Sequence, residues 1–448
     1  MTTPSHGLGL FTDFYELSMG SSLTAHGLDA MATFELFVRR LPPTRRYLVA
    51  CGIQDALDGL GRFRLDADEG DYLSTFAALD RAFVERLCDT GFTGSVSAVA
   101  EGEVVFAGEP IMQVTAPLVE AQIVETFLLN TVGFATLVAS KASRIATACG
   151  SRRFIEFGAR RAHGVDAAMA AARAAYIGGA VGTSLTAAAR RFAIPVSGTM
   201  AHSFVMSFEH EIDAFRAFAA SYPNGDAVLL VDTYDTIEGT RRAVALADQG
   251  VRFRGVRLDS GDLGVLAKTV RSVLDDAGLT DVTILASGDL DEFTIRDLLA
   301  DGAPIDAFGV GTQLSTSADA PSLSCVYKLV EDEHGPKMKH ADGKVTFPGR
   351  KQVYRFERDG SSTHDVITLT SERRPSGARA LLRPVMERGA LLPQVIEPIE
   401  VIRARCAAAT AALPGATKAL EPTDYPAYRV ECSPALLSLM HEHSRRAH

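Results

Sequence analysis

The middle third of the chain repeats one unit, a short apolar run followed by small and polar residues and then by a helix-like segment. Six such units lie between about residues 150 and 315, and their apolar runs are RRFIEF, FAIPV, AVLLV, FRGVRL, DVTILA and IDAFGV. Strands that alternate with helices form a parallel sheet. We expect an irregular α/β barrel rather than an open doubly wound sheet, because polar residues follow nearly every run. In a barrel, these loops meet at one face, where active sites are built.

Both flanks of this repeat show a pattern typical of antiparallel strands. Residues 93–118 and 324–370 contain alternating apolar residues and Gly or Pro turns, and the Asp-Gly pairs of DGKVTF and RDGSS favour hairpins. We therefore expect a second α/β sandwich domain built from both flanks. The predicted order is a first sandwich part (1–125), the barrel with the active site (126–320), a second sandwich part (321–395) and a helical tail (396–448).

Composition excludes several classes of partner. A chain of 448 residues suits two domains, and its net charge of −10 argues against nucleic acid or an anionic membrane as the main partner. Six widely spaced cysteines give neither a zinc-binding pattern nor a disulfide framework. The N-terminus lacks signal-peptide features, and the apolar stretch TVGFATLVASKASRIATAC is interrupted by Lys141 and Arg144, which favours a core helix. We expect a cytoplasmic protein.

Two glycine-containing loops follow the last two predicted strands. They are ASGDLDE, with Ser287 and Gly288, and GVGTQL, with Gly309, Gly311 and Thr312. Glycine lets backbone N–H groups approach an anion, and the last two strands of α/β barrels commonly supply a phosphate site. The two loops together predict phosphate binding.

Charged residues crowd the same predicted face. Arg160 and Arg257 follow strands, where a guanidinium clamps carboxylate or phosphate, whereas Arg161 fits a surface position better. Six aspartates lie nearby, and two interpretations of them stay open. Asp262 and Asp289 suit the first position of a helix, and one or two of the six suit Mg²⁺ held through water. The six are Asp232, Asp235, Asp259, Asp262, Asp289 and Asp291.

Two aromatic residues and one histidine complete the candidates. TDFYELSMG predicts a helix start, with Asp13 and Glu16 spaced as a capping box and Tyr15 in the first turn. Tyr15 and Phe157 fit core packing unless the ligand is a flat ring. His202 follows the FAIPV run, which predicts a buried strand, and the pattern leaves open whether this histidine is structural, a base or a nucleophile.

Eight strings in this chain, in this order, resemble the nicotinate phosphoribosyltransferase family. They run from residue 12 to about 355 and are TDFYELSM, FIEFGARRAHG, GTMAHSF, VDTYDT, GVRLDSGDL, SGDLDE, FGVGTQL and GKVTFPGRKQVYR. The resemblance implies the fold of type II phosphoribosyltransferases, an irregular α/β barrel beside a sandwich domain. Ser18 departs from this pattern, because threonine is common there, and the tail after about 400 matches no family string.

The resemblance also implies a reaction of NAD salvage. Nicotinate attacks C1 of 5-phosphoribosyl 1-pyrophosphate to give nicotinate mononucleotide and pyrophosphate, with ATP hydrolysis coupled through a phosphohistidine at His202 and with Mg²⁺ as cofactor. The implied nicotinate contacts are Tyr15, Phe157, Thr199 and Arg257, and the implied phosphoribosyl or pyrophosphate contacts are Arg160, Ser287, Gly288, Gly309, Gly311 and Thr312. Asp259 is implied beside the ribose as a catalytic carboxylate and Asp289 beside the metal. Tyr15 comes from the neighbouring subunit, which implies a homodimer with shared active sites.

Three alternative functions fit this sequence less well. Nicotinamide phosphoribosyltransferase recognises its amide partly with an acid, yet AAYIGGAVGTSLTAAAR, where that acid is expected, contains none. Quinolinate phosphoribosyltransferase is a shorter chain without a phosphorylated histidine. A non-catalytic nucleotide-binding barrel has no reason to keep His202, Arg257 and both glycine loops together.

Overall fold

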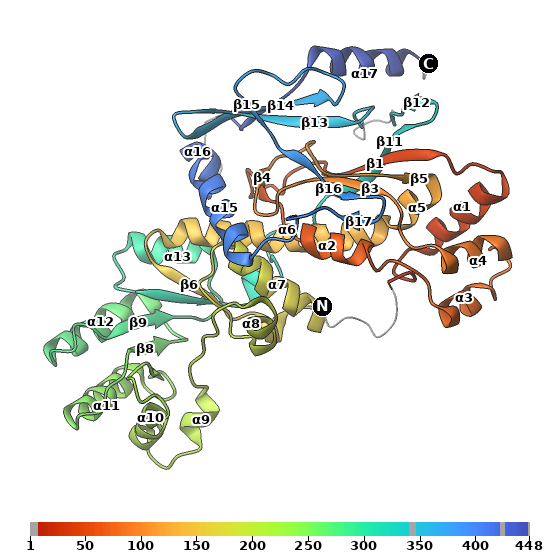
Figure 1. Ribbon diagram of the computed structural model, residues 1–448. Helices are drawn as coiled ribbons and strands as arrows, with labels where there is room; N and C mark the ends of the chain where they lie inside the picture. The colour runs from red at the N-terminus through yellow and green to blue at the C-terminus, as the bar shows by residue number, and fades with distance from the viewer. Residues whose placement is uncertain (1–7, 340–345, 422–425, 447–448) are drawn as a thin grey trace. The chain divides into compact units, whose positions relative to one another are not determined.

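The computed structural model describes residues 8–339, 346–421 and 426–446, and the chain divides into two compact units. Unit 1 combines Met1–Ser140 with Ala320–His448, and unit 2 is Lys141–Asp319. Figure 1 gives the labels of the helices and strands.

Unit 1 is built on a seven-stranded antiparallel sheet with the order β12-β11-β1-β5-β3-β16-β17. Strand β1 pairs with β5 on one side and with β11 on the other, so both flanks of the chain form one sheet, as the sequence predicts. The strands are β1 (Met31–Val38), β3 (Ser95–Val99), β5 (Pro110–Pro117), β11 (Cys325–Asp332), β12 (Gly335–Pro336), β16 (Leu382–Glu387) and β17 (Ala390–Leu391).

The C-terminal part of unit 1 adds a four-stranded sheet with the order β15-β13-β14-β18. Strand β18 pairs in parallel with β14, so the tail supplies a strand as well as helices. The remaining strands of unit 1 are β2 (Leu48–Val49), β4 (Val104–Val105), β13 (Lys351–Arg358), β14 (Ser361–Leu369), β15 (Ala378–Ala380) and β18 (Arg429–Cys432). Its helices are α1 (Phe14–Ala25), α2 (Ile53–Leu60), α3 (Ala67–Leu73), α4 (Arg81–Asp89), α5 (Leu118–Ile123), α15 (Ile399–Ala411), α16 (Gly415–Lys418) and α17 (Pro434–Arg446).

One of the two predicted hairpin turns is confirmed. Asp359 and Gly360 join β13 to β14, and both have positive φ angles, 51° and 76°, as a type I′ turn requires. The other Asp-Gly pair, in DGKVTF, lies outside the described residues.

The predicted capping box at α1 is wrong. Asp13 is the N-cap residue, but its side chain makes no capping hydrogen bond. Its carboxylate instead accepts a hydrogen bond from the hydroxyl of Thr126 at 2.8 Å, and Glu16 accepts from Thr12 and Thr126. Asp13 therefore pairs with Thr126, which is distant in sequence, instead of with the backbone N–H groups of α1.

Helix α6 (Glu125–Cys149) is a core helix, as the sequence predicts. Together with α5 it is long and apolar enough to cross a membrane, but 67% of its most apolar window is buried inside the protein. Lys141 and Arg144 are buried and pair with Glu292, at 2.5 and 2.9 Å. The charges of Lys141 and Arg144 are thus neutralised by an acid within unit 2. A helix that faces lipid has no such partner.

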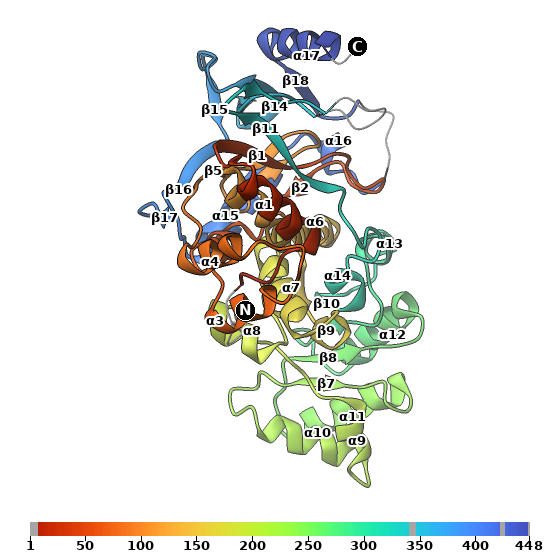
Figure 2. The same ribbon diagram turned by 90° about the vertical axis from the view of Figure 1, so that its right-hand side faces the viewer.

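Unit 2 contains a five-stranded sheet, entirely parallel, with the order β6-β10-β9-β8-β7. Helices α10, α11 and α12 pack against one another and along these strands (Figures 1 and 2). The strands are β6 (Arg153–Glu156), β7 (Val228–Leu230), β8 (Gly255–Leu258), β9 (Thr283–Ala286) and β10 (Ala307–Val310). The helices are η1 (Ala159–Arg161), α7 (Val165–Gly178), α8 (Thr186–Phe192), α9 (His202–Met206), α10 (Glu211–Ala220), α11 (Thr236–Asp248), α12 (Leu263–Asp276), α13 (Glu292–Ala300) and α14 (Thr312–Ser315).

Five of the six predicted strand runs are strands, and FAIPV is not. Its first residue ends α8, Pro195 has no N–H to donate, and Val196 is 62% exposed. The run is reduced to a single parallel bridge between Val196 and Thr183, which in turn bridges Glu156. The sheet is thus extended past β6 by isolated bridges, and this gives the barrel its irregular form.

The interior of unit 2 is hollow at the amino ends of its strands. Alternate side chains such as Phe154, Val256 and Phe308 are buried against the helices. The intervening positions range from polar to apolar, such as Thr283 and Ile155, and they line a cavity of about 510 Å³. Side chains therefore do not fill this part of the barrel as they usually do in such folds.

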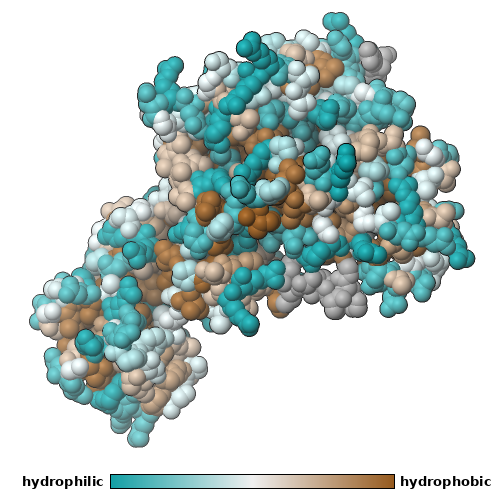
Figure 3. Space-filling model, in the orientation of Figure 1, coloured by the Kyte–Doolittle hydropathy of each residue, from teal (hydrophilic) through white to brown (hydrophobic). Residues whose placement is uncertain are grey.

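The visible surface of the protein is mainly hydrophilic. Figure 3 shows hydrophilic residues over most of the visible face, with apolar residues in scattered groups. All six cysteines are free thiols, as the sequence predicts.

Candidate active site

A second cavity, of about 410 Å³, lies in unit 2 at the carboxyl ends of the strands. Its lining contains six of the predicted site residues, contributed by loops that are far apart in sequence. They are Phe157, Arg160, Thr199, His202, Arg257 and Asp259. The cavity is wide enough for a mononucleotide, and its place is the one that parallel α/β folds use for ligands.

Arg257 is held by three neighbours at the floor of this cavity. Its Nε donates to the Ser287 hydroxyl at 2.8 Å, Nη1 to the Thr199 hydroxyl at 3.1 Å, and Nη2 to Asp259 Oδ1 at 2.5 Å. The guanidinium carbon lies 5.9 Å from the centre of the Phe157 ring. A cation fixed beside an aromatic face suits a flat, negatively charged ligand.

His202 is the first residue of α9 and is partly exposed in the cavity. Its Nδ1 lies 3.2 Å from the hydroxyl of Thr233, and its Nε2 lies 3.8 Å from Asp259 Oδ2. The imidazole is therefore oriented on one side and faces a carboxylate on the other. This arrangement suits a nucleophile or a base better than a buried structural histidine.

Asp259 connects the arginine and the histidine. Burial alone raises the pKa of this carboxyl group, but the hydrogen bond from Ser287 and the charge of Arg257 outweigh burial, and the pKa lies below its usual value. Asp259 therefore stays ionised at neutral pH.

The six aspartates separate into different roles. Asp235, Asp262 and Asp291 cap α11, α12 and α13 with hydrogen bonds to backbone N–H groups, so the helix-start interpretation is confirmed for Asp262. It is wrong for Asp289, which is exposed, has a φ of 46° and precedes the helix by more than one residue. Asp232 Oδ2 accepts from the Asp259 N–H and the Ser260 hydroxyl, both at 2.8 Å.

The glycine loops lie next to this cavity rather than in its lining. Gly288 has a φ of 101°, and a Cβ there would lie 2.3 Å from the Asp259 carbonyl oxygen. A Cβ on Gly309 would meet the Phe157 ring at 2.5 Å, so this glycine makes room for the aromatic residue. Gly311 is the N-cap of the short helix α14, which begins at Thr312.

The other two predicted contacts are more exposed. Arg160 lies in η1, and its side chain has no ion pair or hydrogen bond within the described part of the chain. Tyr15 belongs to unit 1, lies on α1 and is 50% exposed.

Sequence reasoning missed Glu156, which is buried behind the cavity. Its carboxylate accepts hydrogen bonds from the Gly158 N–H at 2.5 Å and from the Thr183 hydroxyl at 2.6 Å. Burial raises the pKa of Glu156. One signal in the sequence points to this residue. Glu156 is an acid inside the otherwise apolar run FIEF, and a strand of a parallel sheet is buried on both faces.

Metal-binding groups of three or more His, Cys, Asp or Glu residues are absent from the described ranges. One observation nevertheless fits a cation or a ligand hydroxyl, because Asp232 Oδ1 is buried without a hydrogen-bond partner in those ranges. Mg²⁺ retains several waters and uses few protein ligands beside phosphates, so Asp232, Asp259 and Asp289 suffice as candidates.

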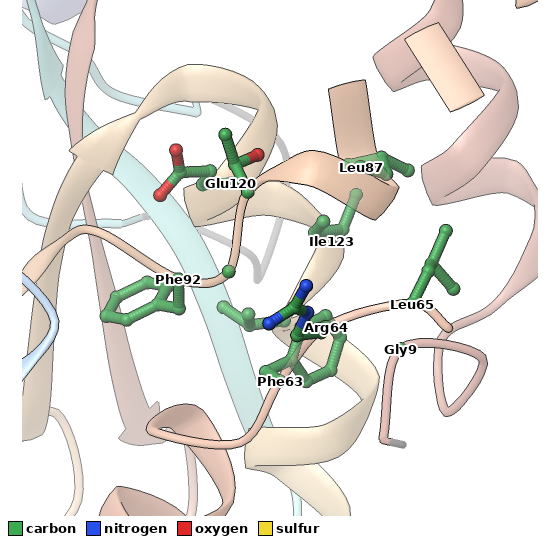
Figure 4. Close-up of a pocket in the computed structure, with 11 residues that line it drawn as sticks. Gly9, Phe63, Arg64, Leu65, Leu87, Phe92, Glu120 and Ile123 are labelled. Carbon is green, nitrogen blue, oxygen red and sulfur yellow. The ribbon is translucent and has the colours of Figure 1, made fainter. Parts of the chain in front are cut away.

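A further cavity, in unit 1, does not suit the reaction (Figure 4). It measures about 20 Å³, room for one water molecule, and is lined mainly by apolar residues such as Phe63 and Ile123. The carboxylate of Glu120 at its edge is occupied by the N–H and hydroxyl of Thr93.

Comparison with known proteins identifies the family of this chain. The family model for the nicotinate phosphoribosyltransferase N-terminal domain matches residues 10–133, and that for the nicotinate phosphoribosyltransferase family matches residues 152–350. Nicotinate phosphoribosyltransferase pncB2 of Mycobacterium tuberculosis is 44% identical over 100% of this chain and 97% of its own length. The Bacillus subtilis enzyme is 46% identical over 82% of this chain and 77% of its own length.

Two solved structures share the fold of this chain. Human nicotinic acid phosphoribosyltransferase superposes with a TM-score of 0.85 and 29% identity, covering 97% of this chain and 100% of that one. Nicotinate-nucleotide pyrophosphorylase from Pyrococcus furiosus has a TM-score of 0.74 and 25% identity, covering 89% and 94% of the two chains. The resemblance seen in the eight sequence strings is confirmed, and the chain belongs to the nicotinate phosphoribosyltransferase family.

Proposed function

We propose that the chain transfers a phosphoribosyl group to nicotinate in the unit 2 cavity and couples this transfer to ATP hydrolysis through a phosphohistidine at His202. The observation that carries the proposal is the setting of His202. Its ring is partly exposed in the cavity, one nitrogen lies beside Thr233, and the other faces the ionised Asp259. A carboxylate beside an imidazole stabilises the positive charge that the ring gains when it is phosphorylated.

Nicotinate fits the Arg257 end of the cavity. Its carboxylate pairs with the guanidinium, the Thr199 hydroxyl adds a hydrogen bond, and the pyridine ring lies on Phe157. The ring nitrogen then attacks C1 of 5-phosphoribosyl 1-pyrophosphate, the C1–O bond breaks, and pyrophosphate leaves with its electron pair. Asp259 stabilises the positive charge that develops on the ribose.

The phosphate groups fit the remaining side of the cavity. Arg160 has no protein partner in the described ranges and is available for an anion, and the loops at Gly288, Gly311 and Thr312 offer backbone N–H groups. Asp289 or its neighbours would hold Mg²⁺, which would neutralise charge on the pyrophosphate.

A homodimer with shared active sites is part of the proposal. The exposed side chains Phe11, Phe14, Tyr15 and Met19 form an apolar group on and just before α1. An apolar group of this kind is typical of a protein interface, and it carries the tyrosine that the second face of the pyridine ring requires. The cytoplasmic location remains a prediction.

Labelling with γ-phosphate-labelled ATP tests the phosphohistidine. We expect the wild type to acquire acid-labile label and His202→Ala to acquire none, while retaining slow transfer without ATP coupling. His210→Ala is the matched control, because His210 is exposed and lies outside the cavity lining. Equal labelling of His202→Ala overturns the assignment.

A turnover assay tests the substrate. Nicotinate, nicotinamide and quinolinate are compared side by side, with and without ATP. We expect turnover of nicotinate, stimulated by ATP. A preference for either other pyridine, or no turnover at all, contradicts the proposal.

A further inference from the structure

Ser287, one of the predicted phosphate contacts, has both its N–H and its hydroxyl hydrogen-bonded within the protein. It follows β9 directly and is 3% exposed. Its backbone N–H donates to the carbonyl oxygen of Leu258 at 2.8 Å. Its hydroxyl oxygen lies 2.8 Å from Arg257 Nε and 2.5 Å from Asp259 Oδ1.

The direction of these hydrogen bonds follows from the chemistry of the groups. Arg257 Nε can only donate and an ionised carboxylate can only accept, so the hydroxyl accepts from Arg257 and donates its single proton to Asp259. No N–H or O–H group of Ser287 is left to donate to a phosphate.

The arrangement also decides which edge of Arg257 remains for a ligand. A guanidinium binds a carboxylate either through its side edge, Nε with Nη2, or through its end edge, Nη1 with Nη2. Ser287 and Asp259 occupy the side edge. At the end edge, Nη1 donates to the hydroxyl of Thr199 at 3.1 Å and makes a long contact of 3.4 Å to the carbonyl oxygen of Met200, with no further partner in the described ranges. Both of these residues line the cavity.

We propose that Ser287 is a positioning residue for nicotinate rather than a phosphate ligand. It locks the side edge of Arg257 together with Asp259, so that the end edge faces the cavity and receives the carboxylate of the substrate. Because Asp259 also faces His202, Ser287 fixes the distance between the nicotinate end of the site and the histidine. This inference rests on the proposed role of Arg257.

The KM values of Ser287→Ala for the two substrates distinguish a positioning residue from a phosphate ligand. We expect the KM for nicotinate to rise about tenfold and the KM for 5-phosphoribosyl 1-pyrophosphate to stay unchanged, because two buried hydrogen bonds that orient Arg257 are lost. A phosphate ligand gives the opposite split. That result, or two unchanged KM values, overturns the proposal.

Ser315→Ala is the matched control. Ser315 is 1% exposed, and its hydroxyl has no hydrogen-bond partner in the described ranges. Its replacement removes a buried hydroxyl of the same size from unit 2, so we expect both KM values to stay unchanged. Should Ser287→Ala fail to fold, Ser287→Cys keeps nearly the same volume with a weaker donor, and the same KM split is expected.

A double-mutant cycle distinguishes this proposal from the role of Arg257 on which it rests. Arg257→Ala alone raises the KM for nicotinate if Arg257 binds the carboxylate, and an unchanged KM refutes that contact. If Ser287 acts through Arg257, adding Ser287→Ala to Arg257→Ala changes the KM for nicotinate no further. A full additional effect in the double variant refutes positioning while leaving the role of Arg257 intact.

Discussion

At the scale of single residues, the partners of each carboxylate decide its charge. Asp259 and Glu156 are both withdrawn from water near the cavity, yet the pKa of Asp259 is lowered and that of Glu156 is raised. Asp259 has a guanidinium beside it, whereas the two partners of Glu156 are the Gly158 N–H and the Thr183 hydroxyl. Neutral donors offset only part of the cost of burying a charge.

This difference predicts a pH dependence for Glu156→Gln. An acid with a raised pKa in the folded state binds more protons there than in the unfolded state, so its contribution to stability falls as pH rises from its ordinary pKa to the raised one. The glutamine has no such dependence. The destabilisation caused by Glu156→Gln should therefore shrink as pH rises above the ordinary pKa of a glutamate, about 4.5.

The measurement is the difference in Tm between the wild type and Glu156→Gln at a series of pH values. Titration of all other groups cancels in this difference. Thr183→Val removes one neutral donor from the same carboxylate and should make the stability of the protein more pH-dependent. A Tm difference that stays constant or grows with pH contradicts the raised pKa.

At the scale of elements, local patterns predicted most strands and failed where tertiary contacts compete. The five strand runs of unit 2 are short apolar runs of mostly buried residues, and Asp262 caps a helix as its position suggests. FAIPV has the same composition, but Pro195 and the end of α8 leave it a single bridge. The carboxylate of Asp13 accepts a hydrogen bond from Thr126, 113 residues away, and local spacing in the sequence cannot predict such a partner.

The loop after β9 gives a prediction at this scale. Gly288→Ala places a Cβ against the Asp259 carbonyl oxygen and strains a φ of 101°, so we expect a loss of about 3 kcal/mol of stability and of most activity. Gly278→Ala is the control, because Gly278 has a φ of 75° at the end of α12 with nothing within 4 Å, and it should cost about 1 kcal/mol. Urea unfolding measures both, and equal losses contradict the close approach at Gly288.

At the scale of the whole molecule, hydrophobic periodicity separates the parallel strands of unit 2 from the antiparallel strands of unit 1. The predicted barrel, 126–320, begins earlier than unit 2, Lys141–Asp319, because α6 continues from one unit into the other without a break. The cavity residues of unit 2 follow from that topology, since parallel strands bring their carboxyl ends together. Tyr15 does not follow from it. Its predicted place in the site rests only on the family resemblance, because a contact between subunits leaves no periodic signal in the sequence of one chain.

The proposed shared active site predicts complementation between two variants that lack ATP-coupled activity. If the site of one protomer uses Tyr15 of the partner subunit, a dimer of one Tyr15→Ala chain and one His202→Ala chain contains one site with both lesions and one intact site. Random pairing makes half of the dimers mixed, so co-expression should restore about a quarter of the wild-type ATP-coupled activity.

Size-exclusion chromatography with light scattering establishes that the variants are dimers. Pairing Tyr15→Ala with Arg257→Ala should complement equally, whereas pairing His202→Ala with Arg257→Ala should not. His202 and Arg257 line the same cavity of unit 2, so each site of that mixed dimer keeps one lesion. Lack of recovery in the first pairing places Tyr15 in its own chain's site or outside any site, and refutes the shared arrangement.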